Sequence, residues 1–205
     1  MALTPLPLSK PGEAVRKLTL SLSKGARFTV ELAWDSKHDL DAHALEGTNN
    51  GDGAKVSDFA QVLSTYNVIK PGITGPVLPR NPDGSFSTIS GALMHSGDKR
   101  DGTLQGVDEM ITIDGARIPA GVNEIPIFVT VHPSTVATFR DVKQASITIK
   151  SDDGRTLGAY QLTNEFGAFN AVQMGSLMLS PSGWEFAAVG VGFNGDFNEV
   201  LSNFS

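Results

Sequence analysis

Residues 28–34 read Phe-Thr-Val-Glu-Leu-Ala-Trp, and this stretch decides the fold class. Apolar side chains stand at every second position from Phe28 to Trp34, with smaller or polar residues between them. Successive side chains of a strand point to opposite faces, so the pattern predicts a strand with one buried face. A helix would instead repeat its apolar positions every three to four residues.

The same alternation, or a short apolar run, recurs along the rest of the chain. Further strands are predicted at residues 18–22, 110–114, 124–131, 145–150, 157–162, 172–179 and 184–191. The turn sequence at 24–25 predicts a hairpin between 18–22 and 28–34, and those at 152–154 and 180–183 predict two more. Short strands separated by turns predict a mainly β fold, a two-sheet antiparallel β-sandwich with a few short helices.

One of these helices is predicted at the C-terminus. Phe197, Val200, Leu201 and Phe204 stand at helical spacing behind Asp196, a residue suited to the N-cap. The helix is amphipathic, and we expect its apolar side to cover an edge or an end of the sandwich.

The length of 205 residues favours a single domain. We expect residues 1–16 to form an N-terminal arm and residues 17–205 to form that domain. Residues 67–90 are rich in Pro and Gly and predict a loop excursion. Residues 57–66 fit a helix and a strand equally well.

Composition excludes several classes of protein. The chain has no Cys, which excludes disulfides, zinc–thiolate sites and a cysteine nucleophile, and which fits a cytoplasmic location. A net charge of −6 argues against nucleic acid as the main partner. Apolar runs stay shorter than the roughly 18 residues that a membrane-spanning helix needs.

The acidic residues gather in two places. Asp39 and Asp41 follow the strongest strand and, on an extended segment, face one side. Asp98, Asp108 and Glu109 lie in a loop punctuated by glycines. Carboxylates and inward-turned carbonyls are the ligands that calcium prefers, so the two groups could form one site. Two solvated acidic loops would give the same pattern, so both interpretations stay open.

Both acidic segments resemble signatures of the TerD family of tellurium-resistance and general stress-response proteins. Trp34-Asp35 followed by Asp-Leu-Asp-Ala at 39–42 resembles the family's strand end and D-L-D-x-S/A element. Residues 95–109 read His-Ser-Gly-Asp-Lys-Arg-Asp-Gly-Thr-Leu-Gln-Gly-Val-Asp-Glu and are similar to H-x-G-D-N-x-x-G-x-x-x-G-x-D-E. The resemblance covers about residues 17–200 and implies a β-sandwich that binds calcium through these two motifs.

The chain departs from the family pattern in this second motif. Lys99 stands where the family usually has Asn, and Val107 where it often has Asp, while Asp101 adds an acid. A lost carboxylate and an added ammonium both weaken cation binding. We therefore expect one well-occupied calcium site and a second that is weak or absent. The implied ligands are the carboxylates of Asp39, Asp41, Asp98, Asp108 and Glu109, with carbonyls such as those of Lys99 and Gly106.

The resemblance implies a non-catalytic binding module in stress response or tellurite resistance, with other proteins as partners. An enzyme would depend on His95 beside Asp98, but no nucleophile motif, phosphate loop or HExxH zinc motif accompanies them. The alternative is a structural or assembly protein, of phage or mobile-element origin, that uses the same fold for protein–protein contacts.

Overall fold

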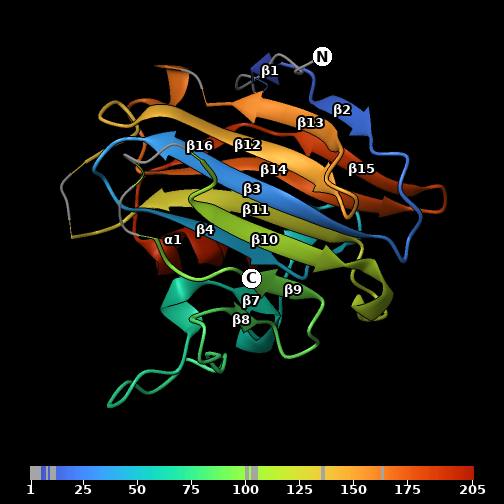
Figure 1. Cartoon of the computed structure of the whole chain (residues 1–205), viewed down its shortest axis with the longest axis horizontal. Coiled ribbons are helices and arrows are strands. Elements are labelled where there is room, and N and C mark those ends of the chain that lie inside the picture. The colour runs from blue at the N-terminus through green and yellow to red at the C-terminus, as the bar shows by residue number, and fades with distance from the viewer. Residues whose placement is uncertain are drawn as a thin grey trace.

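Two sheets packed face to face make up the fold, and Figure 1 shows them lying one over the other. The computed structural model describes residues 6–7, 9, 13–99, 102, 106–134, 137–162 and 164–205. In spatial order, sheet A consists of β1 (Leu6–Pro7), β13 (Thr156–Gln161), β12 (Lys143–Ser151), β3 (Arg27–Asp35), β10 (Glu109–Asp114), β9 (Leu93–His95) and β8 (Phe86–Ser87). Sheet B consists of β2 (Arg16–Thr19), β15 (Gly183–Ala188), β14 (Ala171–Ser180), β11 (Glu124–Val131), β4 (Leu40–Leu45) and β7 (Val62–Leu63), and β16 (Val191–Phe193) also pairs with β14.

The remaining elements are short. They are the ribbon β5 (Thr48–Asn49) and β6 (Ala54–Lys55), the 3₁₀ helices η1 (Phe59–Gln61), η2 (Thr65–Asn67), η3 (Gly115–Arg117), η4 (Asn164–Phe166) and η5 (Ser202–Phe204), and the helix α1 (Phe197–Leu201). Among the described strands only β1 and β13 pair in parallel. The predicted two-sheet antiparallel β-sandwich is therefore confirmed.

The core lies between the two sheets and follows the predicted alternation. On β3, Phe28, Val30, Leu32 and Trp34 are buried in this core, and the residues between them are partly exposed. All eight residues of β11 are buried, because its other face is covered as well. The residues that cover this outer face of β11 pack around Phe128 in a smaller apolar cluster.

The predicted C-terminal helix forms part of that cover. The Asp196 carboxylate accepts the N–H of Glu199, the Glu199 carboxylate accepts the N–H of Asp196, and α1 begins at Phe197. Val200 and Leu201 are buried on sheet B, and the ring of Phe204 stacks on Phe128 with centroids 5.9 Å apart. The helix is confirmed, in a reciprocal capping box.

The predicted hairpin between residues 18–22 and 28–34 is wrong. β2 pairs with β15 in sheet B, whereas β3 lies in sheet A between β10 and β12. Leu20 enters the core, and its N–H bonds the carbonyl of Trp184. The turn at 24–25 therefore carries the chain from one sheet to the other. The predicted hairpins at 152–154 and 180–183 are confirmed.

Residues 57–90 run along the lower side of the molecule in Figure 1, where they contribute β7 and β8 as the last strands of sheets B and A. The ambiguous stretch 57–66 contains η1, β7 and the start of η2. Two further short strands, β8 and β9, extend sheet A at this end. Sequence alternation did not predict them, because they have two and three residues and their pairing is set by the tertiary fold.

The predicted strand at 184–191 divides into β15 and β16, with Gly190 between them at a φ of 62°. Such a positive φ favours glycine and bends the chain out of the first pairing. The division into an arm at 1–16 and a domain at 17–205 stays a prediction. Within the described part of the chain, no helix has the length and apolar character needed to cross a membrane.

Candidate metal centre

Three carboxylates converge at one end of sheet B. Asp39 precedes β4, Asp41 is its second residue, and Asp98 lies in the loop after β9. Each offers one oxygen, and these three atoms all lie within 4.8 Å of one another. The sequence placed Asp39 and Asp41 on one side of an extended segment, and the structure brings Asp98 to the same point from sheet A.

Local structure explains why Asp41 faces this point. Leu40, Ala42 and Ala44 of β4 point into the core between the sheets, so Asp41 and His43 point the opposite way. The backbone carbonyl of Asp39 accepts the N–H of His132, which follows β11. This bond holds the beginning of β4 against its neighbour in sheet B.

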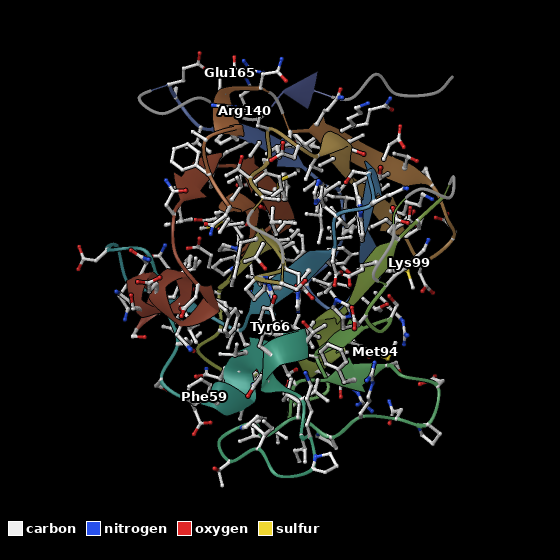
Figure 2. The ribbon with its side chains drawn as sticks, turned by 90° about the vertical axis from the view of Figure 1, so that its left-hand side faces the viewer. Phe59, Tyr66, Met94, Lys99, Arg140 and Glu165 are labelled. Atoms are coloured by element: carbon white, nitrogen blue, oxygen red, sulfur yellow. The ribbon has the colours of Figure 1, made fainter. Side chains whose placement is uncertain are left out.

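Hydroxyl groups from η2 orient the Asp41 carboxylate. Thr65 donates to its Oδ1 over 2.9 Å, and Tyr66 donates to its Oδ2 over 2.5 Å. Burial raises the pKa of Asp41, and these two hydrogen bonds offset part of the rise. Figure 2 shows Tyr66 where the segment that carries η2 meets the sheets.

The cluster is accessible from outside the sandwich. A cavity of about 260 Å³ is lined by the three carboxylates together with Thr65, Tyr66, Lys70, His132 and Ser134. The carboxylate and hydroxyl oxygens of this lining are the hard ligands that calcium prefers, while Lys70 and His132 add nitrogen groups to it. Calcium–oxygen distances of about 2.3–2.6 Å place two ligands of one ion at most about 5 Å apart. The spacing of Asp39, Asp41 and Asp98 therefore fits one such ion.

Asp108 and Glu109 are also buried here, but their oxygens are turned to protein groups. Asp108 Oδ2 accepts the backbone N–H of Trp34 over 2.9 Å, and its Oδ1 lies 2.6 Å from the Lys99 ammonium. Glu109 Oε2 accepts the N–H of Ala42 over 2.7 Å, and its Oε1 accepts the N–H of Lys99 over 3.3 Å. Burial raises the pKa of Glu109.

The sequence pattern also named Lys99, Gly106 and Asp101. Lys99 contributes its ammonium to Asp108 and its backbone N–H to Glu109, from the loop where Figure 2 labels it. Gly106 has a φ of 135°, a conformation that a residue with a side chain rarely adopts. Asp101 lies outside the described residues.

His95 has a different neighbour from the one considered in the sequence. Its ring is buried and stacked on Phe86, with centroids 4.7 Å apart. Nδ1 accepts the N–H of Gly97, so the ring proton is on Nε2, which lies 3.4 Å from Glu109 Oε2. The His95 ring thus faces Glu109 rather than Asp98.

Sequence reasoning missed Thr65 and Tyr66. They lie in the stretch that fitted helix and strand equally well, and no motif marks them. The only local signal is Ser64, which caps η2 by accepting the N–H of Tyr66. Their contact with Asp41 depends on how residues 57–67 fold back over sheet B.

The fold and this cluster define a β-sandwich protein with an oxygen-rich site at one end. The model of the TerD domain family matches residues 84–204, and this chain belongs to the TerD family.

Comparison with known proteins supports the same assignment. The chain is 28% identical to tellurium resistance protein TerD of Alcaligenes sp., over 91% of this chain and 97% of that protein. It is 24% identical to general stress protein 16U of Bacillus subtilis, over 91% and 97% respectively. Its fold is similar to the crystal structure of a TerD homologue from Streptomyces coelicolor A3(2), with a TM-score of 0.58, 23% identity, and coverage of 88% of this chain and 96% of that one.

Proposed function

We propose that this chain is a calcium-binding, non-catalytic module that acts in stress response and tellurite resistance through contacts with other proteins. The observation that carries the proposal is the convergence of Asp39, Asp41 and Asp98 within 4.8 Å. These residues come from both sheets, so an ion held by them would tie one end of the sandwich together. The names of the relatives, tellurium resistance and general stress proteins, support the biological setting.

The contacts of Lys99 support a single well-occupied site. Its ammonium lies 2.6 Å from Asp108 Oδ1 and 3.5 Å from the carbonyl of Val107. A second cation near Asp108 would have to displace this ammonium from a buried carboxylate. The Val107 side chain, 43% exposed, offers no oxygen to compensate. We infer that a second calcium ion binds weakly or not at all.

A non-catalytic role fits the chemistry of the residues around the cluster. The protein has no Cys, so it has no thiol with which to reduce tellurite. His95, the histidine beside the motif, is fully buried against Phe86 and Glu109. The absence of Cys also supports our proposal that the protein works in the reducing cytoplasm.

Thermal melting in calcium, in magnesium and in EGTA tests the proposal. Calcium at about 100 times its dissociation constant should add about 2.7 kcal/mol to the free energy of unfolding. Asp41→Ala and Asp98→Ala should remove most of this gain and most of the calcium binding seen by calorimetry. Asp52→Ala, in an exposed turn, is the matched control and should keep both.

Equal calcium responses in all three variants would contradict the assignment of the site. Light scattering on the same samples separates the module from an assembly protein. A large oligomer whose size and melting temperature ignore calcium would favour the assembly role.

A further inference from the structure

A second, larger cavity lies next to the acidic cluster. It has a volume of about 500 Å³ and is lined by residues of the segments 59–76, 130–133 and 195–198, together with Ala137 and Asn170. Tyr66 belongs to the lining of both cavities. The larger one therefore lies between the segment that carries η2, the end of β11 and the beginning of α1.

Aromatic and aliphatic side chains form its walls. Phe59, Tyr66 and Phe197 supply three rings, and the centroids of Tyr66 and Phe197 are 5.2 Å apart. Phe59 is 51% exposed and Ile73 is 57% exposed, although both are large apolar residues. These two side chains present an apolar surface that a ligand in the cavity would cover. Figure 2 shows Phe59 on the same segment as Tyr66, further from the sheets.

Two polar residues of the lining, Asp196 and Asn67, are engaged in hydrogen bonds within the protein. Asp196 is the lining's one charged residue, and the Asp196 carboxylate caps α1 by accepting the N–H of Glu199 over 2.9 Å. The Asn67 amide donates to the carbonyls of Phe59 and Val62 over 2.7 and 2.9 Å. The lining thus offers no cationic side chain to an anionic ligand, and its one carboxylate serves as a helix cap.

His43, which lies behind the rings of Tyr66 and Phe197, carries no charge near neutral pH. His43 contacts both Tyr66 and Phe197, with ring centroids 5.5 and 5.0 Å away. Its nitrogens bond the hydroxyls of Ser64 and Thr130 over 3.0 and 2.9 Å. Burial holds the pKa of His43 well below its usual value, so the imidazole is uncharged near neutral pH.

We propose that this cavity binds one uncharged, mainly apolar organic molecule that contains an aromatic ring. The volume lies within the range of about 300–1,000 Å³ that small-molecule sites occupy. Apolar walls with few polar groups, and a lining without a cationic side chain, select such a molecule over an anion. Three rings around the space favour a ring in the ligand, because aromatic groups pack edge to face or offset.

Tyr66 links this site to the acidic cluster. Its hydroxyl donates to Asp41 Oδ2, and its ring forms part of the wall. An ion that fixes Asp41 would also fix the ring, so the ligand would bind a preorganised wall. The two binding events should then strengthen each other by the same factor. This second part rests on the proposed function, whereas the existence of the ligand site does not.

Fluorescence titration with the uncharged probe N-phenyl-1-naphthylamine tests the site in the full chain. We expect one saturable site per chain in EGTA. Ile73→Ala should weaken binding by about fivefold, since it removes apolar contact area from the wall. The matched control is Ile89→Ala, an isoleucine that is 61% exposed and outside the lining, and it should keep the original affinity. Ala137→Phe, which fills the cavity, should abolish binding in a variant shown by melting to be folded.

Non-saturable binding, or equal loss in Ile73→Ala and Ile89→Ala, would overturn the site. A second titration series in calcium tests the link through Tyr66. Calcium should tighten probe binding at least fivefold, and Tyr66→Phe should bring the ratio of the two dissociation constants close to one. If calcium binds by calorimetry but leaves probe affinity unchanged, the link is wrong. If calcium does not bind and the probe does, the proposed function fails while the ligand site stands.

Discussion

The acids of this end of the sandwich belong to two groups with opposite surroundings. Asp39, Asp41 and Asp98 approach one another across a cavity. Asp108 and Glu109 each accept a backbone N–H and lie against Lys99 or His95. Buried charge is costly unless it is paired or coordinated. The second group lies against charged or polar groups of the protein, and the first brings three carboxylates together around a cavity whose lining also includes Lys70 and His132.

The second group also has a clear structural task. Glu109 belongs to β10 in sheet A, and its carboxylate accepts the N–H of Ala42 on β4 in sheet B. It thereby joins the two sheets beside the candidate metal centre. Asp108 accepts the N–H of Trp34 on the neighbouring strand β3, where the backbone pairing with β10 ends. Acids that are adjacent in sequence thus serve different contacts, because neighbouring side chains of a strand point to opposite faces.

The largest expected effect is on the second group, Asp108 and Glu109. Glu109→Ala leaves the buried N–H of Ala42 without its acceptor and removes the contact with His95. We expect a loss of about 3 kcal/mol in the free energy of unfolding in EGTA, measured by urea denaturation. Glu109→Gln keeps an acceptor and should lose less. A loss in Glu109→Ala no greater than that in the exposed Asp52→Ala would show that Glu109 does not join the sheets.

A substitution among the converging acids Asp39, Asp41 and Asp98 should not destabilise the protein in EGTA. Burial raises the pKa of the Asp41 carboxyl group, which means that its charged form is destabilised in the folded protein. Asp41→Asn removes this charge, so in EGTA we expect unchanged or higher stability. In calcium at about 100 times the dissociation constant, the variant should lack the gain of about 2.7 kcal/mol. Thermal melts of the variant in calcium and in EGTA measure the stability in EGTA and the gain in calcium. A variant that is strongly destabilised in EGTA would place Asp41 with Glu109 as a structural acid.

Much of the fold could be predicted from the sequence, because period-two alternation records which face of a strand is buried. β3 and β10 to β15 were all predicted, as was α1 with its Asp196 cap. Two of the failures have one cause. The pairing of residues 18–22 with β15, and the short strands β8 and β9, are set by contacts between distant segments. A local pattern shows that a segment is extended but does not show its neighbour.

The same limit applies to the candidate site. Alternation placed Asp39 and Asp41 on one side, and this requires only local geometry. The hydroxyls of Thr65 and Tyr66 reach Asp41 from residues 24 and 25 positions away. The pairing of Lys99 with Asp108 likewise needs the fold of the loop between them. Residue types in a motif identify candidate ligands, but only the tertiary structure shows which of them converge on one point.

A double substitution that removes the ammonium of Lys99 tests the difference between the two groups of acids. Lys99→Asn combined with Val107→Asp removes the ammonium from Asp108 and adds a carboxylate at an exposed position. We expect calorimetry to show a second calcium ion, or a tighter weak step, because affinity depends on the number and charge of the ligands. Two equally tight ions in the unmodified protein would contradict the role given to Lys99.

The smallest expected effect concerns Glu46, a buried acid that pairs with no cation and no other carboxylate among the residues that the structure describes. Its Oε1 accepts the hydroxyls of Thr88 and Ser90, each over 2.5 Å. Burial raises the pKa of Glu46 above that of the unfolded chain, and the two hydroxyls offset part of the rise. The folded state therefore binds its proton more readily, and stability falls as pH rises from about 4.5 through the raised pKa.

Glu46→Gln has no such titration. In urea denaturation, we expect the stability of Glu46→Gln relative to the unmodified protein to increase between pH 4.5 and pH 7, by less than about 1 kcal/mol. A change in the opposite direction would mean that the two hydroxyls favour the charged carboxylate enough to outweigh its burial, and Glu46 would then belong with Asp108 and Glu109.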